Sequence, residues 1–443
     1  MAAGAGHAGS RIQTKNKTHE SFELYGDSES SQEIDIPSGA CFWEFSHAKR
    51  VGVCFKLADP DGDGSVSVTL TGGATGTGLT GRRFLQQIVK LKEYDDKWWG
   101  SLECFIKGTR MDKFDLDLDA ATCSRIHQVF SSHVHGPESR HDGNEELKEE
   151  QDLGFWPRVR QQVSDQRIKL SKMYNRAKES QAPYEEVISL HHVQQFLELL
   201  ADILHRTSCG LVPKEAAFMN LFQRYAQLCK LYLSPGDTIT RKMTVLGYTV
   251  KSMPDFQFRS KDESRNEFLV ITVGECKPSV CRKGSSEKTY GHDSPSTIAA
   301  KRRRLSGLPE KQDHDASVHD KAVQHSPRTA HRLSEDEVAI AELGCKLSGQ
   351  HACDLLLELP HSAMKAYGRG TCMLGLIIEG TKVRLTCLEM KTEHLEKIQS
   401  STEPIDDEEA TLHYTRAYDM LNCNDRKHLD YILLTLAFLN PHM

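Results

Sequence analysis

An apolar run, Phe268–Val273, leads directly into Glu275-Cys276-Lys277, and a Pro254-Asp255 pair stands 20 residues before Glu275. An apolar run of this length is typical of a buried strand, and the polar connector 261–266 marks a turn before it. Side chains alternate along a strand, so Glu275 and Lys277 are expected on one face and Cys276 on the other. The pattern predicts a hairpin that brings Asp255 opposite Glu275 and Lys277.

The surrounding sequence predicts a mixed α/β order. A helix is expected after Pro213, where an early proline is tolerated, to about Leu233. Ser334-Glu-Asp-Glu337 has the form of a capping box, which opens a helix to about Leu359. The expected strands are Met243–Lys251, Asp255–Ser260, Glu267–Lys277, Thr371–Glu379 and Lys382–Met390, the last two joined by a Gly380-Thr381 turn.

These residue types suit chemistry on phosphate. Carboxylates of Asp255 and Glu275 would hold Mg²⁺ (or Mn²⁺) through oxygen atoms, and water and a phosphate oxygen would fill the remaining positions. The Lys277 amine would hold or help to deprotonate the attacking water and offset charge that develops at phosphorus. The plainer alternative is that Asp255 is a turn acid and Glu275–Lys277 a solvated strand end.

On Pro254-Asp255 and Glu275-Cys276-Lys277 the chain resembles the PD-(D/E)xK, or restriction-endonuclease-like, nuclease superfamily over about residues 210–390. The resemblance implies that Asp255, Glu275 and Lys277 are the catalytic set. It also implies an acid from the preceding helix, for which Glu215 is the candidate, and a polar residue from the following helix, for which Gln350 and Glu342 compete. A 55-residue insertion after the Glu-x-Lys strand departs from the family pattern and leaves the register of that helix open.

The remaining sequence divides by composition into segments around this core. We expect a multidomain α+β chain with a disordered tail (1–35), a small β-rich domain (36–131), a linker (132–152), a helical segment (153–209), the nuclease-like core (210–393) and C-terminal helices (394–443) around Ala410–Met420 and Lys427–Leu439. Within the core, residues 279–333 have 11 Lys or Arg, 6 Asp or Glu and Tyr290 as the only aromatic residue, which predicts a disordered basic insertion.

Cellular location is indicated by local charge rather than by the whole chain, whose net charge is −6. Lys301, Arg302, Arg303 and Arg304 form a basic cluster typical of a nuclear-localisation signal. The 13 cysteines lack a CxxC pair and are expected to be reduced thiols, and no apolar stretch is long enough for a membrane span. We therefore expect a nuclear, or nucleocytoplasmic, protein without membrane contact.

Two functional classes remain open. The first is a metal-dependent nuclease acting on DNA or RNA, with the N-terminal domain positioning nucleic acid or a protein partner. The second is an inactive nuclease-fold protein that serves as a nucleic-acid- or protein-binding module, since folds persist when function changes. A defence or mobile-element protein is a third possibility by analogy alone.

Overall fold

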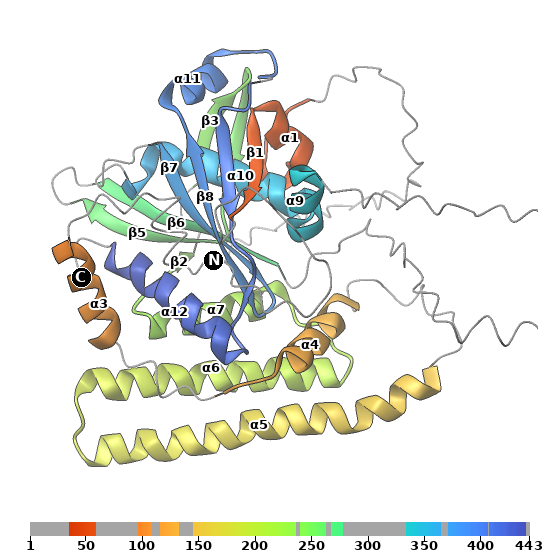
Figure 1. Cartoon of the computed structure of the whole chain (residues 1–443), viewed down its shortest axis with the longest axis vertical. Coiled ribbons are helices and arrows are strands. Elements are labelled where there is room, and N and C mark those ends of the chain that lie inside the picture. The colour runs from red at the N-terminus through yellow and green to blue at the C-terminus, as the bar shows by residue number, and fades with distance from the viewer. Residues whose placement is uncertain are drawn as a thin grey trace, which may run out of the picture. The chain divides into compact units, whose positions relative to one another are not determined.

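The fold is organised around a mixed sheet of eight strands (Figure 1). The computed structural model describes residues 35–58, 96–108, 116–132, 145–235, 240–262, 267–277, 334–364, 371–405 and 407–439. The expected tail, the basic insertion and the Lys301–Arg304 cluster lie outside the described residues. From Ile36 onward the described residues belong to one compact unit.

The strands follow the spatial order β1 (Val53–Leu57), β9 (Ala410–Tyr414), β8 (Lys382–Met390), β7 (Cys372–Glu379), β6 (Glu267–Lys277), β5 (Phe256–Asp262) and β2 (Ser234–Pro235), with β10 (Tyr418–Asp419) paired to β8. β1 and β9 are parallel, as are β6 and β7, and the other pairs are antiparallel. A parallel pair needs a crossover. The described part of the β6–β7 connection consists of α9 (Glu335–Leu343), α10 (Cys345–Glu358) and the 3₁₀ turn η5 (Leu359–His361).

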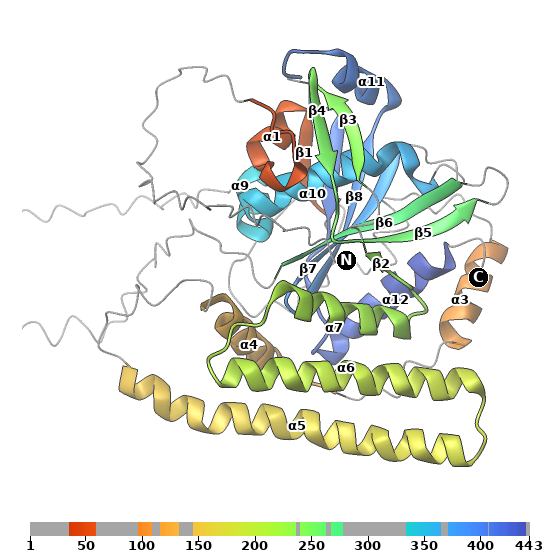
Figure 2. The same cartoon turned by 180° about the vertical axis from the view of Figure 1, so that it is seen from behind.

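Two separate apolar cores cover the two faces of this sheet. On one face, alternate β7 residues such as Leu374 and Leu376 join a core with α4 (Ala120–Ser132), α5 (Glu145–Glu179), α6 (Tyr184–Ser208), α7 (Glu215–Leu228) and α12 (Cys423–Phe438). On the other, Met373 and Ile377 join a core with η1 (Ala40–Phe42), α1 (Phe45–Arg50), α9, α10 and α11 (Thr392–Ser400). Figures 1 and 2 show these helices on either side of the strands. Burial on both faces explains why β7 has a continuous apolar sequence.

A small second sheet corrects one predicted strand. The stretch Met243–Lys251, expected to be a single strand, belongs to a hairpin of β3 (Arg241–Val245) and β4 (Tyr248–Ser252). Leu246 and Gly247 have φ values of 49° and 82°, and two positive φ angles are what a tight type I′ hairpin turn requires. The turn therefore depends on a leucine in a conformation that glycine adopts more readily.

The helices before the core agree with the sequence, with moved boundaries. The helical segment expected at 153–209 begins earlier, because its first helix, α5, starts at Glu145; the expected linker is therefore helical from that residue, and Pro157 lies inside the helix. α6 lies in the expected helical segment, and α7 begins after Pro213 as expected but ends at Leu228 rather than near Leu233. The Ser334–Glu337 capping box is present, but the helix it opens ends at Leu343, because Gly344 has a φ of 79° and α10 starts afresh.

The two ends of the described chain differ most from expectation. In residues 36–131, expected to be β-rich, the described part contains α1, α3 (Asp96–Gly108), α4 and the single strand β1, which joins the central sheet; residues 59–95 are not described. The helix expected at Ala410–Met420 is wrong. Its alternating burial is that of a strand, and β9 lies between β1 and β8. The expected helix at Lys427–Leu439 is confirmed as α12, and no described helix is long and apolar enough to cross a membrane.

Candidate active site

The side chain of Asp255 is hydrogen-bonded to the backbone of β6. Asp255 immediately precedes β5, and its Oδ2 atom accepts a hydrogen bond of 2.7 Å from the amide of Cys276, the residue between Glu275 and Lys277. The antiparallel register pairs the next residue, Phe256, with Gly274. The predicted hairpin thus brings these three signature residues together.

A β-bulge sets the face on which Glu275 and Lys277 lie. The β5–β6 register pairs Phe258 with Thr272 and Arg259 with Val270, which leaves Ile271 as an extra residue on β6. Val270 and Val273 therefore belong to the same core, although they are three residues apart. Beyond the bulge, Glu275 faces α10, and Cys276 joins the core on the opposite face.

Lys277 lies among three carboxylates. Its Nζ atom is 3.4 Å from Glu275 Oε2, 3.5 Å from Glu215 Oε2 and 3.8 Å from Asp255 Oδ2. Partial burial alone would lower the pKa of the Lys277 amine, but Glu275, Asp255 and Glu215 outweigh it and raise that pKa. The ammonium is therefore the positive centre of the cluster.

Glu215 reaches this cluster from the first turn of α7. Its carboxylate is within 3.5 Å of Lys277, and its backbone carbonyl accepts a weak hydrogen bond from the Cys276 thiol at 3.8 Å. Burial raises the pKa of Glu215, and the nearby Lys277 opposes that rise. The acid expected from the preceding helix is thus beside the signature residues.

The structure distinguishes the two candidates on the following helix. Gln350, on α10, donates a hydrogen bond of 2.8 Å from Nε2 to Glu275 Oε2. Glu342, on α9, instead accepts a hydrogen bond of 2.7 Å from Arg384 Nη2. The break at Gly344 puts them on separate helices, so Gln350 joins the site and Glu342 does not.

Asp354, one turn beyond Gln350, was missed by the sequence reasoning. It is 1% exposed and accepts a hydrogen bond from the Ser252 hydroxyl, and its carboxyl group lies within hydrogen-bonding reach of Glu275. Burial raises the pKa of Asp354 to about 6. Burial, then the neighbouring Asp354, raises the pKa of Glu275 well above its usual value. Had the register of this helix been known, the four-residue spacing from Gln350 would have placed Asp354 on the same face of the helix.

A second buried acid on α10 has complete partners. Glu358, one turn beyond Asp354, accepts hydrogen bonds of 3.0 Å from Arg241 Nε and 2.6 Å from Gln257 Nε2. Gln257 in turn accepts 2.6 Å from Arg259 Nε. Gln350, Asp354 and Glu358 therefore form a polar row along α10 that faces the sheet and the β3–β4 hairpin.

The donor set suits a hard cation such as Mg²⁺, which binds carboxylate oxygens. Glu275 Oε1 and Asp354 Oδ2 are buried without a hydrogen-bond partner among the described residues. However, among the described residues no group of three His, Cys, Asp or Glu side chains is arranged to hold a metal ion, and the Lys277 ammonium lies 3.4 Å from Glu275 Oε2. Asp255 and Glu275, the predicted ligands, thus fit by donor chemistry but do not form an assembled ligand group.

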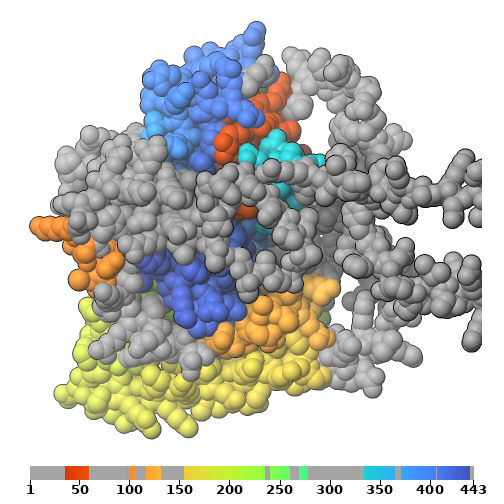
Figure 3. All heavy atoms as spheres, in the orientation of Figure 1, coloured from red at the N-terminus to blue at the C-terminus, as the bar shows by residue number. Residues whose placement is uncertain are grey.

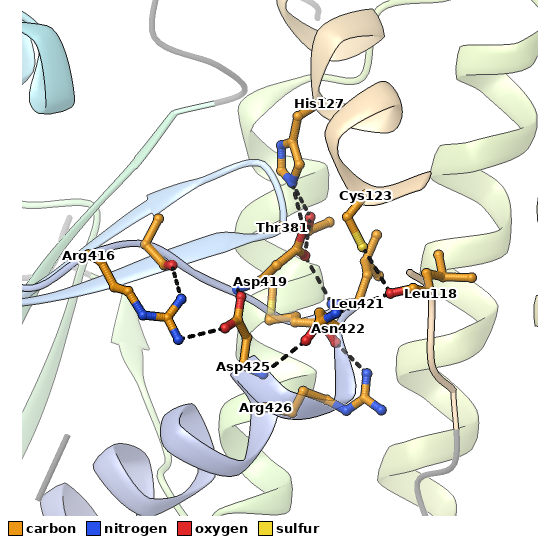
Figure 4. A network of polar contacts seen from close by, with 12 residues as sticks. Leu118, Cys123, His127, Thr381, Arg416, Asp419, Leu421, Asn422, Asp425 and Arg426 are labelled. Carbon is orange, nitrogen blue, oxygen red and sulfur yellow. Dashed lines mark hydrogen bonds and ion pairs between the residues drawn. The ribbon is translucent and has the colours of Figure 1, made fainter. Parts of the chain in front are cut away.

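A polar network fixes the sheet next to the site (Figure 4). Gly380, in the β7–β8 turn, donates a 2.9 Å hydrogen bond to the Lys277 carbonyl. The next residue, Thr381, lies 3.0 Å from His127 Nε2 and donates a 2.9 Å bond to Asp419, which is itself 3.0 Å from His127. α4 and β10 therefore support the turn that contacts Lys277.

The same network includes Cys123, and the grouping of Cys, His and Asp raises the question of a thiol nucleophile. Cys123 is 5% exposed, and burial followed by the charge of Asp419 raises the pKa of its thiol far above the usual range. A nucleophilic cysteine needs a lowered pKa and access. The arrangement is therefore a structural support.

Comparisons with protein-family models, curated proteins and solved structures found no match to this chain.

Proposed function

We propose that this chain is a PD-(D/E)xK nuclease-like protein that hydrolyses phosphodiester bonds of nucleic acid with Mg²⁺ or Mn²⁺. The observation that supports it is the convergence of Asp255, Glu275 and Glu215 around Lys277, with Gln350 hydrogen-bonded to Glu275. Asp255 and Glu275 would hold the ion, which would polarise the phosphate. Lys277 would offset the negative charge that develops at phosphorus.

Nuclease assays with single- and double-stranded DNA and RNA would test this proposal. The wild type would be compared with Glu275→Gln and Lys277→Met, and with Glu396→Gln, an exposed acid on α11, as the matched control. We expect Mg²⁺- or Mn²⁺-dependent cleavage that falls by about 10²–10⁴-fold in the two site variants, the range for loss of a positioned catalytic group. Equal cleavage by all four proteins would exclude this site.

The second candidate is a nuclease-fold binding module without turnover. The position of Lys277 among three carboxylates favours it, because the amine occupies the space where those oxygens would otherwise approach one cation. Titration with Mn²⁺ in the absence of nucleic acid distinguishes the two. Binding that is lost in Glu275→Gln supports the metal-dependent enzyme, whereas no binding together with retained affinity for nucleic acid supports the module.

Nuclear location is proposed from the basic cluster Lys301, Arg302, Arg303 and Arg304. A fluorescent fusion of the full chain would be compared with a variant carrying four alanines there. Loss of nuclear accumulation is expected, since import receptors bind such clusters. An unchanged distribution of the fusion protein would refute the proposed role of this cluster in nuclear import.

A further inference from the structure

We propose that one exposed face of α5 is a docking surface for the phosphate backbone of double-stranded nucleic acid. The face consists of Arg158, Gln162, Asp165, Lys169, Lys172 and Arg176, called here the α5 stripe. Their spacing of three and four residues puts all six on one side of a helix, and all six are exposed. Nucleic acid is chosen as the polyanion because of the proposed function.

The opposite face of α5 holds it in the fold. Val159, Val163, Leu170 and Ala177 are buried in the core shared with α6. Figures 1 and 2 show α5 as the outermost helix, with α6 between it and the sheet, and Figure 3 shows the yellow, coloured part of α5 at the surface in that view. The stripe therefore faces solvent on a helix whose position is fixed by its apolar side.

Positive charge is concentrated in the C-terminal part of α5, whereas the first ten residues of the helix contain five acids and one lysine. Residues 155–179 contain seven Lys or Arg and two Asp or Glu, in a chain with a net charge of −6. Cations in a last helical turn are explained by the helix dipole, but that effect does not extend to Arg158, Lys169 or Lys172. Asp165, the one acid in the stripe, accepts a 2.8 Å hydrogen bond from Gln161. Arg158, Lys169 and Lys172 therefore present positive charge along the exposed side of the helix.

The chemistry of the stripe favours a nucleic-acid backbone over other partners. Protein interfaces depend on buried aromatic or aliphatic anchors, and a membrane-surface helix inserts an apolar face. The apolar face of α5 is already occupied, and the stripe itself has no apolar residue. Single-strand binding uses aromatic stacking, and the stripe has no aromatic residue either.

The dimensions also suit a duplex. Arg158 and Arg176 are 18 positions apart, about 27 Å along a helix, which corresponds to about eight base-pair steps. Arginine and lysine side chains in a rigid row can each neutralise phosphates and release counterions. A surface of this kind would bind duplex nucleic acid without reading its sequence, because phosphate contacts carry no base information.

Fluorescence anisotropy of the full chain in EDTA, which prevents metal-dependent cleavage, tests the surface independently of catalysis. The probe is a duplex of about 20 base pairs, about 68 Å long and therefore longer than the stripe. The test variant is Arg158→Gln/Lys172→Gln/Arg176→Gln. The matched control, Lys391→Gln/Lys397→Gln/Lys427→Gln, makes the same change in net charge elsewhere, and Arg158→Lys/Lys172→Arg/Arg176→Lys keeps the charge.

We expect the test variant to bind at least about tenfold more weakly at moderate salt, and its slope of log affinity against log salt to fall by about 2.7, or 0.9 for each lost contact. The control and the charge-keeping variant should bind like the wild type. Equal affinity of test and control variants would overturn the proposal, as would loss of only single-strand binding or of only binding to anionic lipid vesicles. Glu275→Gln should bind normally, so failed cleavage and failed docking are separate results.

Discussion

Replacing Lys277 with methionine keeps the length of the side chain and removes its charge. The ammonium lies within 3.4–3.8 Å of three carboxylates, and Glu275 is fully buried. Removing one partner of a buried ion pair costs about 3–5 kcal/mol. Because the Lys277 side chain is 27% exposed and that of Glu215 is 42% exposed, solvent screening reduces this value, and we expect about 2–3 kcal/mol of lost unfolding free energy at neutral pH.

The loss of unfolding free energy in Lys277→Met should depend on pH, and the direction of that dependence is set by the protonation of Glu275. The pKa of Glu275 is raised first by burial and then by Asp354, against the opposing effect of Lys277. As pH rises above the unfolded value of 4.5, the unfolded chain releases this proton before the native state does, so stability falls until the native pKa is passed. Without Lys277 that pKa rises further, and the loss continues to higher pH. The substitution should therefore cost least near pH 5 and most at alkaline pH.

Urea unfolding at several pH values, followed by circular dichroism, measures this cost. Lys277→Met would be compared with the wild type, with Glu275→Gln and with the double variant, because the double-mutant cycle isolates the coupling between the two residues. We expect the double variant to regain most of the stability that Lys277→Met loses. A cost that is the same at every pH, or that the double variant retains in full, would refute the reasoning.

Three further substitutions test the surroundings of the site. A Cβ atom at Gly274 would lie 1.7 Å from the Phe256 ring, so Gly274→Ala should lose about 1–3 kcal/mol in urea unfolding, and adding Phe256→Leu should restore part of it. Ser334→Ala removes a helix cap and should lower stability by about 1 kcal/mol, whereas no change would mean that α9 does not depend on the cap. Burial would raise the pKa of Asp419, but its hydrogen bond with His127 helps to lower it, so its stabilising effect is present above pH 3.8 and is lost as pH falls through the native pKa. Asp419→Asn should therefore unfold at lower urea concentration at pH 7, with a flatter acid limb, and an unchanged limb would contradict this account.

Elements with strong local signals were predictable from sequence. The apolar runs of β6 and β7, the alternating apolar residues of β8 and the capping box at Ser334 are signals contained in the local sequence, because buried strands and capped helices need specific residues. β9 was missed because its five residues acquire their strand form by pairing on both sides with β1 and β8. Such long-range pairing leaves little trace in the local sequence.

For the site, spacing along the chain found Asp255, Glu275 and Lys277, but geometry across the fold was needed for the rest. The bulge at Ile271 changes which face the later β6 residues occupy, and period-two counting cannot locate it. Gly344 divides the expected helix after β6 into α9 and α10. The local sequence did not predict this break, and the choice between Gln350 and Glu342 depends on it. Asp354 was missed for the same reason.

The contrast between two acids on α10 bears on whether this cluster has a function. Glu358 is fully buried, yet Arg241 and Gln257 satisfy both of its oxygens, as expected of a structural acid. Glu275 and Asp354 are buried beside each other, and each has an oxygen without a hydrogen-bond partner in the described chain. Two neighbouring carboxyl groups can share a proton or a cation between them. Since well-packed apolar residues at such positions are often as stable or more so, an arrangement that retains both acids is better explained by chemistry at this site than by the needs of folding.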